Sequence, residues 1–250
     1  MNSTRTVLVT GGSRGIGAAA AWKCAQQGWA VAVNYARDRD AAERIVDRIL
    51  ATGGQALALQ ADVADEAQVL KMYAAIDAEM PPLGALVNNA GVIDLPGRVE
   101  TTTVERLQRM FAINVIGSFI CAREAVKRLS TQHGGRGGAI VNLSSAAARI
   151  GAPGQYVDYA AAKGAIDVFT MGLAKEVALE GIRVNAVRPG LIETEIHASG
   201  GLPNRVRDLA HQVPMGRGGT ADEVAQAIVW LLSPESSYTT MSLVEVSGGR

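Results

Sequence analysis

Short runs of valine, leucine and alanine alternate with longer segments of helical character along this chain. Runs so continuously apolar are typical of strands that are buried on both faces of a parallel sheet. We therefore predict strands at Thr6–Thr10, Ala30–Tyr35, Ala56–Ala61, Ala85–Asn88, Ala139–Ser144, Arg183–Val187 and Leu243–Val246. The predicted helices are Gly15–Gln27, Asp40–Thr52, Glu66–Glu79, Val104–Leu129, Val157–Glu180 and Ala221–Leu232. This alternation indicates right-handed βαβ units in a doubly wound, seven-stranded parallel sheet of the α/β class, flanked by helices.

The predicted units follow one another without a linker. The glycine-rich stretch Gly134–Gly138 is too short to separate two domains, so we predict a single domain over residues 1–250. Hydrophobic residues make up 48% of the chain and charged residues 19%. Disordered proteins show the opposite balance, with little apolar content and high net charge. The composition therefore supports one large, well-packed core.

Charge and cysteine content exclude several classes of function. The 24 basic and 24 acidic side chains cancel, so the chain lacks the excess positive charge that attracts nucleic acid or an anionic membrane. Cys24 and Cys121 are too few for a disulfide scaffold and do not form a metal-ligand cluster. There is no signal-peptide pattern and no run of ~18 apolar residues. We expect a cytoplasmic protein that binds neither nucleic acid nor membranes.

The stretch Arg188–Pro214 departs from the regular alternation. It contains several glycines and prolines and no helical or strand pattern longer than a few residues. Long irregular segments in compact domains are usually lids or binding loops. Ligands of open α/β sheets bind at the carboxyl ends of the strands. We therefore expect a substrate lid at about 188–214, with a solvent-exposed connection as the alternative.

A glycine-rich turn, TGGSRGIG at Thr10–Gly17, joins the first predicted strand to the first predicted helix. Gly11 permits a tight turn, and Gly15 and Gly17 let the backbone and the helix approach a pyrophosphate. The start of the helix offers N–H groups and the positive end of its dipole to the phosphates. A glycine-rich turn is weak evidence by itself. Its place in a βαβ unit makes a dinucleotide site the better interpretation.

Tyr159 and Lys163 are four residues apart on a predicted helix and therefore lie on one face. With its ordinary pKa of ~10, a tyrosine hydroxyl is too weak an acid for rapid proton exchange at neutral pH. A neighbouring ammonium group, together with an oxidised nicotinamide at the dinucleotide site, would favour the phenolate and lower that pKa. The hydroxyl then gives a proton to a carbonyl oxygen or takes one from an alcohol. Such pairs also occur on ordinary amphipathic helices, so the prediction depends on the other motifs.

Further motifs follow in order: NNAG at Asn88–Gly91, Asn114, Ser145, YAAAK at Tyr159–Lys163 and RPG at Arg188–Gly190. Together with the T-G-x-x-x-G-x-G spacing of the turn, they make the chain resemble the classical short-chain dehydrogenases/reductases over essentially its whole length. The resemblance implies a Rossmann fold and hydride transfer between a nicotinamide cofactor and a carbonyl or secondary alcohol. Residues 151–167 also resemble uncharacterised bacterial oxidoreductases related to sugar 1-dehydrogenases and 3-oxoacyl carrier-protein reductases.

The resemblance also implies roles for individual residues. Tyr159 handles the proton and Lys163 tunes it. Ser145 positions the substrate oxygen. Asn114 supports a proton relay, with a polar residue that caps or kinks its helix as the alternative. Ser145 lies fourteen residues before the tyrosine, one more than is most common. The adjacent Ser144 is the second candidate for the serine. The expected cofactor contacts are Gly11, Ser13, Arg14, Gly15, Ile16, Gly17, Tyr35, Arg37, Asp62, Val63, Asn88, Ala90, Gly91, Tyr159, Lys163, Pro189, Gly190, Ile192 and Thr194.

The end of the second predicted strand bears on the choice of cofactor. An acidic side chain there binds the ribose 2′-hydroxyl of NAD and repels a 2′-phosphate, but this chain has Tyr35. Arg37 follows, and Arg14 lies in the glycine-rich turn. Two guanidinium groups are suited to holding a phosphate. We predict NADP(H) as the preferred cofactor, while Asp38 and Asp40 leave NAD(H) possible.

The predicted helices at 104–129 and 157–180 carry wide apolar stripes. In the family that the chain resembles, these helices pair between subunits. We therefore expect a homotetramer, and a monomer that buries both stripes is the alternative. Arg128 and Lys175 on these helices would attract an acidic acyl-carrier protein, although charged residues on a helix are usually its solvated face.

The sequence leaves the small-molecule substrate and the direction of reaction open. A sugar 1-dehydrogenase and a 3-oxoacyl reductase are the enzyme alternatives. A non-catalytic NADP(H)-binding redox sensor is a third, disfavoured because Tyr159 and Lys163 are both present.

Several other residues complete the set of candidates. His133, His197 and His211 show no metal-ligand spacing, so we expect no metal. His197, Tyr156 and Asp158 are candidates for substrate contact, with packing as the alternative for the last two. Met241 and Ser242 stand where relatives often have a glycine turn.

Overall fold

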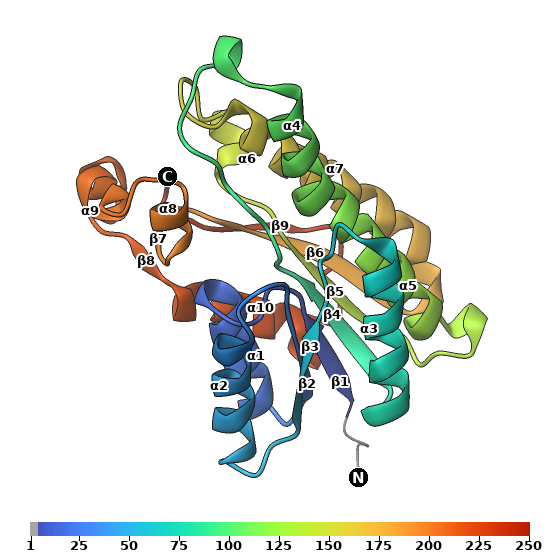
Figure 1. The fold of residues 1–250 in the computed structure, drawn as a ribbon. Helices are drawn as coiled ribbons and strands as arrows, with labels where there is room; N and C mark the ends of the chain where they lie inside the picture. Colours follow the sequence, from blue (N-terminus) through green and yellow to red (C-terminus); the bar gives the residue numbers. More distant parts are fainter. Residues whose placement is uncertain (1–4) are drawn as a thin grey trace.

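A single parallel sheet forms the middle of the molecule. The computed structural model describes residues 5–250, apart from the side chain of His197. Seven strands pair in the order β3, β2, β1, β4, β5, β6, β9, and the neighbours are parallel. Their bounds are β1 Thr6–Val9, β2 Ala30–Tyr35, β3 Ala56–Gln60, β4 Leu83–Asn88, β5 Gly138–Leu143, β6 Ile182–Pro189 and β9 Leu243–Val246. The predicted single-domain, doubly wound sheet is confirmed (Figure 1).

Helices cover both faces of this sheet (Figure 1). One face carries α1 Gly15–Gln26, α2 Arg39–Leu50 and α10 Ala221–Leu232, and the other carries α3 Glu66–Glu79, α5 Gly117–Leu129 and α7 Val157–Val177. Successive side chains of a strand point to opposite faces. Val7 and Val9 of β1 therefore enter the core beneath α1, and Leu8 enters the core beneath α3. This double burial explains why the strand sequences are apolar without alternation.

The two cysteines lie in different cores. Cys24 of α1 packs in the first core and Cys121 of α5 in the second, and both thiols are free. Burial raises the pKa of each thiol to about 12. Because the thiolate is the reactive form, both side chains serve as small apolar packing groups.

The predicted helix at 104–129 is interrupted. Residues Val104–Phe111 form α4 and α5 begins at Gly117, with a π-helical turn at Ala112–Ile116 between them. Asn114 is fully buried at the centre of this turn. A π turn inserts one extra residue into a helix and often marks a functional position. The other long helix, α7, ends at Val177, three residues earlier than predicted, and continues as a 3₁₀ turn to Glu180.

The segment at 188–214 contains only short elements, as expected. After β6 come β7 Ile192–Glu193, α8 Ile196–Ser199, α9 Arg205–Leu209 and a 3₁₀ turn at Ala210–Gln212. Strand β7 pairs with β8, Gly219–Thr220, in a separate two-stranded ribbon. In Figure 1 this part projects beyond the carboxyl ends of the strands, beside the C-terminus. Its closure as a lid stays a prediction.

Met241 makes a strained turn before β9. Its φ is 63°, in the left-handed region that disfavours side chains other than glycine. Its N–H donates to the carbonyl oxygen of Val184 at 2.7 Å. This hydrogen bond joins the turn to β6, so the edge strand β9 pairs in register despite the missing glycine.

Candidate active site

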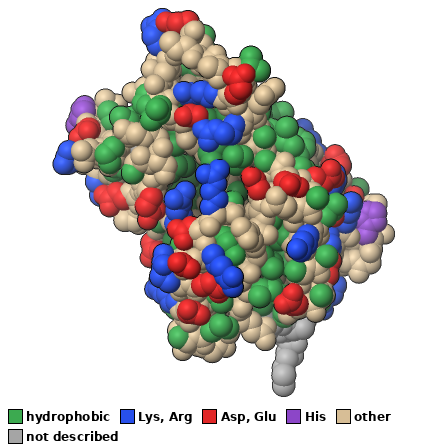
Figure 2. Space-filling model, in the orientation of Figure 1, with side chains coloured by type: hydrophobic (Ala, Val, Ile, Leu, Met, Phe, Trp, Pro, Cys, Tyr) green, Lys and Arg blue, Asp and Glu red, His purple; other side chains and the backbone are tan. Residues whose placement is uncertain are grey.

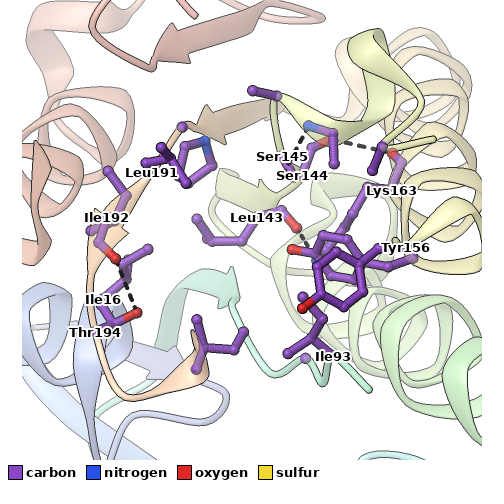
Figure 3. A pocket seen from close by; sticks show the side chains of 18 of the residues that line it. Ile16, Ile93, Leu143, Ser144, Ser145, Tyr156, Lys163, Leu191, Ile192 and Thr194 are labelled. Atoms are coloured by element: carbon purple, nitrogen blue, oxygen red, sulfur yellow. Dashed lines mark hydrogen bonds between the residues drawn. The ribbon is translucent and has the colours of Figure 1, made fainter. Parts of the chain in front are cut away.

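A cleft opens where β5 and β6 end and α7 begins. Its cavity volume is about 150 Å³. Figure 3 shows the residues of its two walls: Ser145, Tyr156 and Lys163 on one side, and Leu191, Ile192 and Thr194 on the other. Tyr159 and Ile16 line the same cleft. The structure thus brings together residues from five motifs, the glycine-rich turn, NNAG, Ser145, YAAAK and RPG, at the edge where open α/β sheets bind their ligands.

The glycine-rich turn forms a cradle beside this cleft. Gly11 and Gly15 have φ values of 60° and 53°, which glycine adopts readily. A Cβ atom on Gly17 would collide with the carbonyl oxygen of Gly11. Helix α1 begins at Gly15 with no side-chain cap and no acidic residue in its first turn. Because these N–H groups lack a side-chain partner, the cradle fits the pyrophosphate of a dinucleotide.

Two asparagines that were not among the predicted cofactor contacts fix this turn. Asn89 donates from Nδ2 to the carbonyl oxygens of Thr10 and Gly11, at 2.8 and 3.0 Å. Asn34 accepts from the N–H of Gly11 at 3.1 Å and donates to the carbonyl oxygen of Ala61 at 3.0 Å. A buried polar residue at the end of an apolar strand was the signal for Asn34.

The two asparagines of the NNAG motif lie in different surroundings, one in the core and one at the cleft. Asn88 was expected along the cofactor ribose, but its side chain is buried and donates to Asn142 Oδ1 and Ser118 O, both at 3.0 Å. Asn89 and Gly91 line the cleft instead. Consecutive side chains of a strand point to opposite sides, so the motif offers the side chain of its second asparagine to the cleft.

Tyr159 lies in the first turn of α7, and its hydroxyl hydrogen-bonds the side chain of Ser145. Burial raises the pKa of Tyr159 to about 12, and the hydrogen bond with Ser145 acts in the opposite direction. The lowered pKa that we expect from Lys163 together with an oxidised nicotinamide stays a prediction, because the raised value belongs to the chain by itself. Burial disfavours the charged phenolate more strongly than the neighbouring groups favour it.

Lys163 is buried below Tyr159. Its Nζ lies 5.6 Å from the centroid of the tyrosine ring and donates to the carbonyl oxygen of Leu143 at 2.6 Å. Burial lowers the pKa of Lys163 to about 8, while Asp167 acts in the opposite direction. Asp167 is itself paired with Arg188, at 2.8 Å, so its charge is shared. A lysine that titrates near neutral pH in a cleft is typical of functional sites.

The two adjacent serines have different surroundings. Ser144 is buried, and its hydroxyl donates to the carbonyl oxygen of Lys163 at 3.2 Å. Ser145 is partly exposed in the cleft, accepts from the N–H of Ala147 at 3.1 Å and contacts the Tyr159 hydroxyl. This geometry favours Ser145 as the residue that meets the substrate oxygen.

Asn114 binds the chain that follows β4. Its Nδ2 donates to the carbonyl oxygens of Val92 and Met110, both at 3.0 Å, and its Oδ1 accepts from the N–H of Val92 at 3.2 Å. A Cβ on Gly91 would lie 2.7 Å from Asn114 Oδ1 and 3.6 Å from Lys163 Nζ. The glycine therefore lets the backbone pass between the asparagine and the lysine.

The comparisons with known proteins agree with this geometry. The protein-family model described as Enoyl-(Acyl carrier protein) reductase matches residues 11–250. The uncharacterised oxidoreductase YgfF of Escherichia coli is 57% identical, over 97% of this chain and 98% of its own. The chain belongs to the short-chain dehydrogenase/reductase family.

Other members are similar over the full length. The 3-oxoacyl-[acyl-carrier-protein] reductase FabG of Staphylococcus aureus is 36% identical, over 100% of this chain and 99% of its own. An NADPH-dependent aldehyde reductase-like protein of Arabidopsis thaliana is 35% identical, over 98% and 93%. A solved short-chain dehydrogenase/reductase variant of Serratia marcescens has a TM-score of 0.90 at 33% identity, covering 98% and 97%. Membership makes this chain an oxidoreductase acting on CH–OH groups, in a family that binds NAD(P).

In this short-chain dehydrogenase/reductase, the predicted cofactor contacts near the end of β2 differ in exposure. Tyr35 is only 6% exposed and packs in the core beneath α1 and α2. Arg14 and Arg37 are both exposed. Asp38 caps α2, because its carboxylate accepts from the N–H of Ala41 at 2.9 Å.

Other predicted contacts lie after β3, in the glycine-rich turn and after β4. The Oδ1 of Asp62 accepts from the N–H of Ala64 at 3.0 Å, and Val63 is buried against Gly117. Ser13 is partly exposed in the turn, and the N–H of Ala90 donates to Thr10 Oγ1 at 3.0 Å.

Thr194 brings the 188–214 segment to the cradle. A Cβ on Gly15 would lie 3.3 Å from its Cγ2. The other predicted contacts of this segment, Pro189, Gly190 and Ile192, line the cleft.

Tyr156 and Asp158 differ in position. Tyr156 lines the cleft, whereas Asp158 is buried and forms an ion pair with Arg106 at 2.7 Å. The side chain of His197 lies outside the described residues. Among those residues no cluster of histidine, cysteine or acidic side chains is arranged to hold a metal ion. Nor does any helix of the described chain have the length and hydropathy to cross a membrane.

Proposed function

We propose that this protein is an NADP(H)-dependent oxidoreductase that interconverts a small carbonyl compound and the corresponding secondary alcohol. The observation that carries the proposal is the convergence of Ser145, Tyr159 and Lys163 in one cleft beside the glycine-rich cradle.

When bound, the nicotinamide supplies or accepts the hydride. The Tyr159 hydroxyl gives its proton to the carbonyl oxygen during reduction and takes it back during alcohol oxidation. Ser145 donates a hydrogen bond to the same oxygen and stabilises the charge that develops there. The Lys163 ammonium group stabilises the phenolate that is left. Asn114 holds the neighbouring backbone in place for the relay of the proton.

The preference for NADP(H) is supported by the charges at the end of β2. Arg14 and Arg37 are exposed cations, while the carboxylate of Asp38 is engaged in capping α2. A 2′-phosphate there meets two guanidinium groups rather than a free carboxylate. The relative from Arabidopsis thaliana is described as NADPH-dependent.

The deciding experiment measures turnover of ketones, 3-oxoacyl thioesters, sugars and secondary alcohols with both cofactors. We expect a preference for NADP(H), and a loss of about 10²–10⁴-fold in kcat for Tyr159→Phe. Arg14→Ala and Arg37→Ala should each reduce that preference. The matched control is Arg39→Ala, since Arg39 is exposed nearby but paired with Glu43.

Each contrary outcome has a distinct meaning. Preference for NAD(H) contradicts the cofactor assignment alone. Full activity in Tyr159→Phe contradicts the chemistry. Cofactor binding without turnover of any substrate class favours the redox sensor.

We also propose a homotetramer that forms through α4–α5 and α7. Between α5 and α7 runs a groove in which Phe119 stacks on Phe169, with ring centroids 3.8 Å apart. Ile116, Phe119 and Val168 are 52%, 47% and 65% exposed, so these helices present apolar surface to a second copy. Phe119→Glu should therefore lower the mass measured by light scattering. Leu70→Glu, at a comparably exposed leucine of α3, is the control.

A small substrate is better supported than a carrier-protein thioester. Arg128, one of two cations considered for carrier docking, is paired with Asp77 at 2.6 Å and with Glu124. Lys175 is exposed.

Two buried free thiols fit a reducing, cytoplasmic setting. We assign the segment at 188–214 as the lid that excludes water from the reaction.

A further inference from the structure

Two arginines of the cleft wall have no acidic side chain as a partner in the described ion pairs. Arg205 comes from α9 and Arg250 follows β9, and both belong to the wall of the cavity that contains Tyr159. The other arginines near the cleft are engaged: Arg106 with Asp158, Arg188 with Asp167 and Arg149 with Glu245. Among the described ion pairs none includes Arg205 or Arg250, and the cavity wall contains no acidic side chain.

Arg250 in particular has an unsatisfied hydrogen-bond donor. Its Nη1 is buried and has no hydrogen-bond partner. Burial, with the nearby charge of Arg205, lowers the pKa of Arg250. A buried N–H without an acceptor and two neighbouring like charges both destabilise the chain. A bound anion would relieve both.

Arg205 lies beside one of the tyrosines at the start of α7. Its guanidinium carbon lies 5.0 Å from the centroid of the Tyr156 ring. Tyr156 is the N-cap residue of α7, and Tyr159 follows in the first turn. Tyr156, Tyr159 and both arginines line the same cavity. An anion bound by the two arginines therefore shares this cavity with a substrate oxygen that contacts Tyr159.

We propose that Arg205 and Arg250 form a subsite for the anionic group of the substrate, a carboxylate or a phosphate monoester a few bonds from its carbonyl carbon. The inference rests on the proposed function, because it names the substrate class of the same cleft. The subsite is separate from the cofactor phosphates, which meet the cradle at Gly11–Gly17 and the cations Arg14 and Arg37. Guanidinium groups bind both kinds of anion in bidentate fashion.

The test compares substrates that differ in charge. Acetoacetate is paired with methyl acetoacetate, and dihydroxyacetone phosphate with dihydroxyacetone, in assays with NADPH. We expect kcat/KM to favour the charged member of one pair, and that pair identifies carboxylate or phosphate. In Arg205→Ala and Arg250→Ala the ratio of charged to neutral kcat/KM should fall about 10–100-fold, as for loss of a hydrogen bond to a charged group.

Arg207→Ala is the matched control. Arg207 lies two residues further on α9, is exposed and is paired with Asp208 at 3.4 Å. The ratio should be unchanged in this variant. Equal use of charged and neutral substrates, or a preference that survives both arginine substitutions, overturns the subsite while leaving the proposed function standing.

A second measurement does not depend on catalysis. Isothermal titration calorimetry with malonate and with inorganic phosphate, on protein saturated with NADP⁺ so that the cradle is filled, should detect binding to the native protein and to Arg207→Ala. The binding should be lost in Arg205→Ala/Arg250→Ala. If no carbonyl compound is turned over, the proposed function fails and calorimetry alone decides on the subsite. Binding that persists in the double variant, or no binding of either anion, overturns it.

Discussion

Asn114 and Val92 are joined by two hydrogen bonds. The side-chain amide of Asn114 donates to the carbonyl oxygen of Val92 and accepts from its N–H. The same contact that two strands make in a sheet is here made by one side chain. It fixes the chain after β4 to the π-helical turn and brings Gly91 against Lys163. We therefore expect Asn114 to act as a positioning residue for the lysine.

Replacing Asn114 by alanine leaves the N–H and carbonyl groups of Val92 without their partner. We expect the free energy of unfolding to fall by about 1–3 kcal/mol, as measured by urea denaturation. The pH dependence of kcat should also shift, because the backbone beside Lys163 loses its support. An unchanged pH profile would leave Asn114 with a purely structural role.

The two serines can be told apart by activity. Ser145→Ala removes the donor beside the Tyr159 hydroxyl, so kcat should fall by about 10²–10³-fold. Ser144→Ala removes a hydrogen bond to the carbonyl oxygen of Lys163 and should cost about 1 kcal/mol of stability. Steady-state kinetics and thermal unfolding of both variants check this. The assignment of Ser145 is wrong if Ser144→Ala shows the larger loss in kcat.

The lowered pKa of Lys163 has a consequence for stability. The folded chain binds this proton with a pKa of about 8, against an ordinary value of 10.5. Between these values the unfolded chain holds more protons, so stability rises with pH. The native protein should therefore gain up to about 3 kcal/mol relative to Lys163→Met between pH 8 and 10.5. Urea unfolding of both proteins at several pH values measures it, and a constant or shrinking difference contradicts it.

Met241→Gly should stabilise the protein. The substitution relieves the left-handed φ of 63°, and part of that gain is lost because glycine is more flexible in the unfolded chain. We expect a net gain of about 0.5–1 kcal/mol in thermal or urea unfolding. Ser237→Gly is the control, since Ser237 is exposed with an ordinary φ of −56° and its replacement should not stabilise the chain.

The sheet was predictable because a strand that is buried on both faces appears in the sequence as a continuous run of apolar residues. Residues such as Val7, Leu8 and Val9 are all apolar although they enter different cores. The π turn was not predictable, because the apolar stripe from 104 to 129 continues through it. Only the buried side chain of Asn114, which needs partners, shows why the helix changes there.

The position of a candidate-site residue was predictable where the spacing within one motif sets it. The four-residue spacing of Tyr159 and Lys163, for example, places both side chains on one face of a helix. Long-range contacts were not predictable. Arg205 and Arg250 meet only because β9 brings the last residues beside the cleft, and no local pattern records that. The raised pKa of Tyr159 in the chain by itself was not predictable for the same reason, since the depth at which a hydroxyl is buried is a property of the whole fold.

The placement of Cys24 and Cys121 in separate cores makes each thiol a reporter for its own side of the sheet. Folded protein should resist maleimide, because both thiols are buried and protonated. Labelling therefore records the moment at which a layer of helices detaches. Identical labelling rates at the two sites mean that the molecule opens as one cooperative unit, and unequal rates identify the layer that leaves first.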